Sequence, residues 1–187
     1  FVEKPLSKSV EEAVVMKAKC EKFGAKVQVG FIERFNPAFI ELKNIADCDG
    51  VINVDFTRTN RLSSRISDVD VVLDLMIHDI DLVLSLVDSP IAAIDAVGSV
   101  VIGPHEDIAN ARLTFENGTF ANLTASRVNS EPQRTMRIEG QQGSTKIDFS
   151  PPQSAYTIDV CQQAHSLRID LPNTTQEDID YLQSRFF

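Results

Sequence analysis

The stretch DVVLDLMIHDIDLVLSLVD, residues 70–88, is apolar around most of its circumference, yet it carries two acids and a histidine on one line. Asp74, His78 and Asp81 are spaced i, i+4 and i+7, so a helix places them on one stripe. A helix that is apolar on its other faces is expected to be buried. Because buried acids and histidines are costly unless paired, we expect the stripe to line a cleft, where a carboxylate can orient the histidine for proton transfer.

Other interpretations of this helix stay open. His78 also fits a hydrogen-bonded core residue, and Asp81 also fits a salt bridge to a neighbouring loop. Asp79 lies on a different side of the helix from His78, and we expect it at the surface. The stripe offers one imidazole and two carboxylates, with no second histidine or cysteine close in sequence, so no metal site is predicted.

The composition predicts a folded protein. The chain has 187 residues, 43% of them hydrophobic, which suits one ordinary domain with a short appended element. Its 18 Lys and Arg against 27 Asp and Glu give a net charge of −9, which argues against binding to nucleic acid or to anionic membranes. No apolar run approaches the roughly 20 residues that cross a bilayer. The three cysteines lie far apart without a CxxC pair, which fits a reducing cytoplasm.

Residues 1–31 are predicted to be the end of a Rossmann-like dinucleotide-binding domain. A strand ends at Glu3-Lys4-Pro5, a helix capped by Ser9 follows, and residues 26–31 alternate like a second strand. Parallel strands joined by a helix are typical of such domains. No Gly-x-Gly-x-x-Gly occurs in the sequence, so we expect the phosphate-binding half to lie upstream of Phe1.

Residues 32–187 are predicted to form an α+β domain for substrate binding and dimerisation. A helix begins at Asn36-Pro37, and Asn117-Gly118 is a strong hairpin signal. We expect strands over residues 51–59, 91–102, 108–115, 119–128, 135–139, 144–149, 156–161 and 166–171. Consecutive hairpins predict an open antiparallel (mixed) sheet with helices on one face. The other face is free to serve as the interface of a homodimer or homotetramer.

Four features together resemble one family. Glu3-Lys4-Pro5 ends a strand, Arg34-Phe35-Asn36-Pro37 follows the next one, Asp74, His78 and Asp81 share a helix, and a sheet closes the chain. In this order they resemble the NAD(P)-dependent oxidoreductases of the glucose-fructose oxidoreductase, inositol dehydrogenase and rhizopine-catabolism (Gfo/Idh/MocA) family. The resemblance implies a nicotinamide cofactor, NAD or NADP, and a sugar-like substrate.

The resemblance also implies roles for individual residues. Lys4 matches the lysine of the family's EKP motif, which reaches the nicotinamide ribose and the reacting hydroxyl, and Glu3 and Pro5 belong to the same cofactor-binding turn. His78 matches the histidine that takes the hydroxyl proton. Asp74 matches its partner acid, which orients the histidine or contacts the sugar. Chemically, an ammonium at Lys4 stabilises a developing alkoxide.

Five further residues are candidates for binding. Arg34 and Asn36 follow a strand at its carboxyl end, where ligands gather in open α/β sheets, so both are candidates for the cofactor. Asn36 also fits a helix cap, and Arg34 also fits an ion pair with Glu33 or Glu41. The basic residues near the predicted cleft, Arg58, Arg61 and Arg65, suit the diphosphate of a nucleotide sugar, although a solvated loop explains them equally well.

Within the family, residues 29–44, 65–83 and 105–118 resemble a subgroup that oxidises the 3-hydroxyl of UDP-N-acetylglucosamine to a ketone. The leading hypothesis is therefore hydride transfer from a secondary alcohol of a sugar or sugar nucleotide. One alternative is the same chemistry on an inositol or a free sugar. Another is a non-catalytic ligand-sensing or dimerisation module. In each case we expect residues 1–187 alone to be inactive, because most of the cofactor site is not among them.

Overall fold

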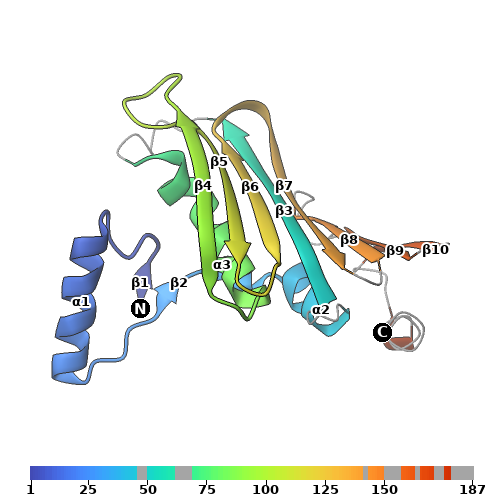
Figure 1. Ribbon diagram of the computed structural model, residues 1–187, viewed down its shortest axis with the longest axis horizontal. Helices are drawn as coiled ribbons and strands as arrows, with labels where there is room; N and C mark the ends of the chain where they lie inside the picture. The colour runs from blue at the N-terminus through green and yellow to red at the C-terminus, as the bar shows by residue number, and fades with distance from the viewer. Residues whose placement is uncertain are drawn as a thin grey trace.

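The computed structural model describes residues 1–45, 50–61, 69–140, 143–149, 157–162, 165–170 and 175–177. Two strand systems organise them (Figure 1): a small parallel pair near the N-terminus and a sheet of eight strands. No helix in these described ranges is both long and apolar enough to cross a membrane.

The N-terminal unit is a strand, a helix and a strand. β1 (Val2–Glu3) pairs in parallel with β2 (Val29–Gly30), and α1 (Val10–Phe23) connects them. The helix begins as predicted, because the Ser9 side chain accepts a hydrogen bond of 3.2 Å from the backbone N–H of Glu12. It ends at Gly24, whose φ of 61° suits a residue without a side chain. No residue of α1 is buried among the described residues.

The large sheet is mixed. Its order is β10-β9-β8-β7-β3-β6-β5-β4, which confirms the predicted open, mixed sheet, and consecutive hairpins account for every neighbour except those at its centre. There β3 lies between β6 and β7, parallel to the first and antiparallel to the second. The strands are β3 (Val51–Arg61), β4 (Ile91–Ser99), β5 (Ile108–Phe115), β6 (Phe120–Ser126), β7 (Val128–Gly140), β8 (Gly143–Asp148), β9 (Thr157–Gln162) and β10 (His165–Asp170).

Helices cover one face of this sheet, as predicted (Figure 1). They are the 3-10 turn η1 (Ile32–Phe35), α2 (Pro37–Ile45), the π-helical turn η3 (Val72–Met76) and α3 (Ile77–Leu86). The core beneath them combines alternate strand residues such as Phe56 and Leu123 with helix residues such as Phe39 and Leu82, all at most 2% exposed. The helix predicted over 70–88 is confirmed over residues 71–86, and five residues near its start, Val72–Met76, form a π turn, a feature that is frequent at functional sites.

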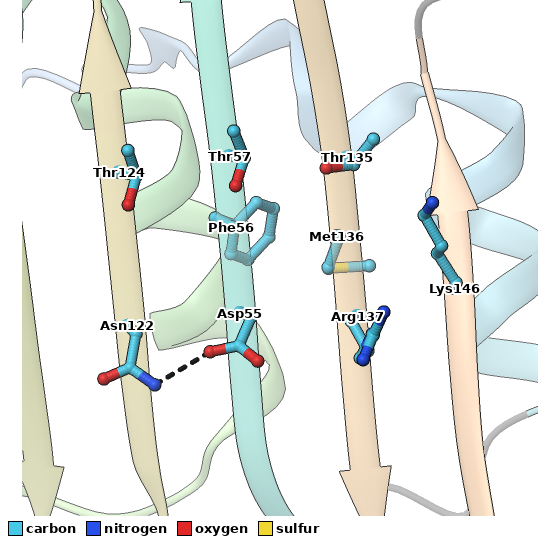
Figure 2. A pocket seen from close by; sticks show the side chains of 9 residues that line it. All are labelled: Asp55, Phe56, Thr57, Asn122, Thr124, Thr135, Met136, Arg137 and Lys146. Carbon is cyan, nitrogen blue, oxygen red and sulfur yellow. Dashed lines mark hydrogen bonds between the residues drawn. The ribbon is translucent and has the colours of Figure 1, made fainter.

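The other face of the sheet is polar. Asp55 on β3 lies opposite Asn122 on β6 and Arg137 on β7, and Arg137 in turn lies opposite Lys146 on β8. Figure 2 shows these side chains in one row, with a hydrogen bond of 2.8 Å from the Asn122 amide to Asp55. They line a hollow of about 370 Å³.

Candidate active site

Lys4 crosses from the N-terminal unit to the π turn of the large domain. Its ammonium donates a hydrogen bond of 2.6 Å to the backbone carbonyl of Asp74 and lies 3.9 Å from the Asp74 carboxylate. Burial lowers the pKa of Lys4, and Arg58 lowers it further, although the Asp74 charge opposes both. Burial likewise raises the pKa of Asp74. Lys4 is thus a charged group held in a half-buried place.

His78 lies on α3, one turn after Asp74. Burial lowers the pKa of His78 to about 4, and the positive charges of Arg58, Lys4 and Arg134 add to this effect, while Glu33 opposes it. Its Nδ1 is buried and has no hydrogen-bond partner among the described residues. Nε2 is therefore the ring nitrogen that a ligand can reach. At neutral pH the imidazole is uncharged and able to accept a proton.

A buried ion-pair cluster lies behind His78. Arg58 donates from Nε and Nη2 to the Asp79 carboxylate at 2.7 to 3.1 Å, and from Nη1 to Glu33 at 3.0 Å. Asp79 is only 1% exposed, so the prediction that it lies at the surface is wrong. Asp79 lies on the side of α3 that faces the sheet, where a charged side chain has only an internal partner.

A second ion pair joins η1 to α3. The guanidinium of Arg34 donates to both carboxylate oxygens of Asp81, with 2.6 Å from Nε to Oδ2. This confirms the interpretation of Asp81 as a salt-bridging residue, and it gives Arg34 a partner other than the predicted Glu33 or Glu41. Asn36 caps α2, since its side-chain oxygen accepts a hydrogen bond of 3.1 Å from the backbone N–H of Ala38.

The π turn is anchored from the sheet. Arg127, between β6 and β7, donates from Nε to Asp107 at 2.7 Å and from Nη1 to the carbonyl of Val69 at 2.8 Å, just before η3. Asp107 also accepts three backbone hydrogen bonds from residues 101–103, which hold the pKa of its carboxyl far below the ordinary value. The backbone N–H of Val71 donates to the carbonyl of Glu106 at 2.9 Å. Sequence reasoning missed this anchor.

The remaining predicted residues are placed as follows. Glu3 and Pro5 flank Lys4, and the side chain of Glu3 lies close to Gly30 on the neighbouring strand. Arg61 is exposed and donates to the carbonyl of Ser130 at 3.1 Å. Arg65 lies outside the described residues.

Arg58 is placed away from solvent. It is 4% exposed, and the carboxylates of Asp79 and Glu33 engage its guanidinium nitrogens, so we assign it no phosphate contact. The structure therefore brings together Lys4, Asp74 and His78 but does not gather the three predicted arginines at one surface. Asp74 contacts Lys4, and no hydrogen bond joins it to His78 among the described residues.

Comparison with known proteins agrees with this arrangement. The model of the GFO/IDH/MocA C-terminal domain matches residues 50–146, just over half of the chain. The chain belongs to the GFO/IDH/MocA family. Its matched region contains the sheet strands β3 to β7, η3 and α3, and thus both Asp74 and His78.

Individual members of this family are similar to the chain. A UDP-N-acetylglucosamine 3-dehydrogenase of Acidithiobacillus ferrooxidans is 36% identical over 149 residues, which cover 80% of this chain and 47% of the relative. A solved structure of that enzyme superposes with a TM-score of 0.81 at 31% identity, covering 98% of this chain and 60% of the other. A scyllo-inositol 2-dehydrogenase (NAD(+)) of Bacillus subtilis is 29% identical over 140 residues, or 68% of this chain and 41% of the relative. The chain thus spans about half the length of the curated relatives it matches.

Proposed function

We propose that this chain forms the substrate side of an NAD(P)-dependent oxidoreductase that removes a hydride from a secondary alcohol of a sugar nucleotide, the 3-hydroxyl of UDP-N-acetylglucosamine. The observation that carries the proposal is the meeting of Lys4 with the helix that bears Asp74 and His78. A purely structural domain gains nothing from a half-buried ammonium near a half-buried, uncharged imidazole, because both groups cost desolvation energy. The 36% identity to a UDP-N-acetylglucosamine 3-dehydrogenase supports the choice of substrate.

The chain's own residues supply the acid-base part of this reaction. His78 accepts the hydroxyl proton at Nε2, because Nδ1 is buried. The low pKa of the His78 side chain leaves the imidazole uncharged at neutral pH, in the form that can accept a proton. The Lys4 ammonium stabilises the oxygen as negative charge develops on it. The Asp74 carbonyl holds Lys4 in place. When bound, the nicotinamide supplies the hydride acceptor.

Among the described residues, the segment that fits such a cofactor is the turn at the end of β1. Glu3, Lys4 and Pro5 follow a strand that is paired in parallel, at the edge where dinucleotides gather in α/β sheets. We propose that residues 1–31 are the end of a dinucleotide-binding domain. The apolar side chains Val10, Val14 and Phe23 on α1, each more than half exposed among the described residues, support this proposal because a larger domain buries such a face.

We further propose that the open sheet face joins two copies in a cytoplasmic homo-oligomer. Register places Lys146, Arg137, Asp55 and Asn122 in one row across β8, β7, β3 and β6. A two-fold axis parallel to the strands, between β7 and β3, sets Asp55 of one copy against Arg137 of the other. The same axis sets Asn122 against Lys146. The first of these contacts joins opposite charges, and the second joins an ammonium to a neutral amide whose oxygen can accept a hydrogen bond, so no like charges meet in this part of the row, which favours self-association.

The experiment that tests the catalytic proposal uses the full-length gene product. The protein is incubated with NAD or NADP and, in parallel, with UDP-N-acetylglucosamine, scyllo-inositol and free hexoses, and reduced nicotinamide is followed by absorbance. Reduction with the sugar nucleotide and not with the polyols is expected. Reduction with inositol alone would overturn the substrate, and no reduction with any alcohol would favour a non-catalytic module.

A further inference from the structure

We propose that Arg58 is a positioning residue, which fixes the rotation of α3 about its own axis and so sets where His78 points. The proposal rests on the proposed role of His78 as proton acceptor. Arg58 is buried on the helix-covered face of β3, only 4% exposed, and no hydrogen bond or ion pair among the described residues joins it to Lys4. It acts through Asp79, the residue next to His78, and through Glu33 on η1.

Two ion pairs hold α3 from different sides. Asp79 and Asp81 are two positions apart, so they point to nearly opposite sides of the helix, about 200° apart. Arg58 holds the first and Arg34 holds the second. A rotation of α3 that shortens one contact lengthens the other, and each contact uses two guanidinium nitrogens. The pair of clamps therefore allows one rotation angle.

Both ion-pair networks include a residue of the turn η1. Glu33 and Arg34 are adjacent in η1, and Glu33 accepts from the same guanidinium that binds Asp79. η1 follows β2, the strand next to the one that ends at Lys4. The Arg58 network thus joins the helix that carries His78 to the unit that carries Lys4. A change at Arg58 alters the position of one reacting group relative to the other.

Replacing a buried ion pair by apolar residues is often neutral or stabilising, so stability alone is a weak reason to bury Arg58 at 5% side-chain exposure with Asp79 at 1%. A planar fork with fixed hydrogen-bond directions gives orientation, which an apolar contact does not. Its charge also faces the imidazole, together with Lys4, Arg134 and Glu33 from the other elements packed around His78.

The test compares three variants of the full-length protein. Arg58→Lys keeps the charge and loses the fork. The double variant R58Q/D79N replaces the Arg58–Asp79 pair by neutral hydrogen-bonding groups, so that Asp79 is not left as an unpaired buried charge, and it keeps Glu33 unchanged. Lys17→Gln is the matched control, because it removes one positive charge from an exposed ion pair on α1. The readouts are kcat, KM and a histidine NMR titration, with the His78 signal identified by its loss in His78→Gln.

We expect Arg58→Lys to lower kcat by about 10- to 100-fold with KM changed less than about threefold, because the reacting groups shift while binding contacts remain. We expect R58Q/D79N to raise the midpoint of the His78 titration by about one pH unit or more. Both variants falling in thermal stability while kcat and the His78 titration match Lys17→Gln would overturn the proposal. The histidine spectrum requires no turnover: with an inactive wild type the proposed function is refuted, and an unchanged His78 chemical shift and titration midpoint in both Arg58 variants would separately overturn the coupling of Arg58 to His78.

Discussion

Lowering the pH from about 7.5 to about 5.5 distinguishes the buried His78 from an ordinary histidine. With an ordinary pKa of about 6.5, the neutral fraction falls from about nine-tenths to about one-tenth. The surroundings of His78 lower its pKa to about 4, so about 97% of the imidazole remains neutral at the lower pH. Only the neutral form accepts a proton. We therefore expect kcat/KM to change by less than about twofold, where an ordinary histidine loses about tenfold.

The direction of the His78 pKa shift follows from the groups around the imidazole. Burial disfavours the imidazolium most, the neighbouring cations add to this, and Glu33 opposes it without reversing it. The folded pKa lies below the unfolded one, so this histidine favours folding above the ordinary pKa of about 6.5. That contribution is lost as the pH falls from there toward about 4. Circular dichroism at each pH shows whether the protein is still folded where the rates are compared.

The assay is nicotinamide reduction by the full-length protein in buffers of constant ionic strength. His105→Gln is the control, because His105 lies in the loop after β4 and is not among the groups that act on His78. His78→Gln should lower kcat by a factor of order 10² to 10⁴ at every pH. An acid limb with a midpoint near pH 6.5, present in the wild type and in His105→Gln, would refute the reasoning.

Three further predictions concern other parts of the molecule. Lys4→Met should lower kcat about 10²-fold or more with the fold intact by circular dichroism; unchanged kcat would remove Lys4 from the mechanism. Asp107→Asn should lower the free energy of unfolding in urea by about 2 to 4 kcal/mol at pH 7, because it leaves the buried Arg127 charge uncompensated. The difference from wild type should shrink below about pH 4, where Asp107 of the unfolded chain is protonated; a constant difference would contradict the ion pair. Asp55→Arg should reduce the oligomer mass measured by light scattering and R137D/D55R should restore it; an unchanged mass in D55R would exclude the open face as the interface.

Local signals in the sequence predicted most of the fold. Ser9 and Gly24 bound α1, and Asn36 caps α2, because capping chemistry depends on one or two neighbouring residues. The order of the large sheet was not readable in the same way. β3 enters between β6 and β7, more than 50 residues away in the chain, and a hairpin signal carries no information about such a strand.

The candidate site residues were predicted less evenly. Lys4, Asp74 and His78 carry a family motif, and the structure places them together. The π turn was not predicted, since 3.6-residue periodicity treats residues 72–76 as ordinary helix. One consequence is that Asp74 meets Lys4, where simple i, i+4 spacing suggested that it would meet His78.

The buried partner of Asp79 was nevertheless implied by the sequence. In the strand VINVDFTRT, residues 51–59, the alternation that puts Val54 and Phe56 on the core face also puts Arg58 there. An arginine on a core face needs an acid, and an acid in a helix that is apolar all round needs a cation. Each residue taken alone suggested a solvated charge, so Arg58 was interpreted as a phosphate contact and Asp79 as a surface residue. Taken together, the two periodicities place Arg58 and Asp79 in the same interior, where each is the partner of the other. This ion pair is the contact that we propose orients α3 and His78.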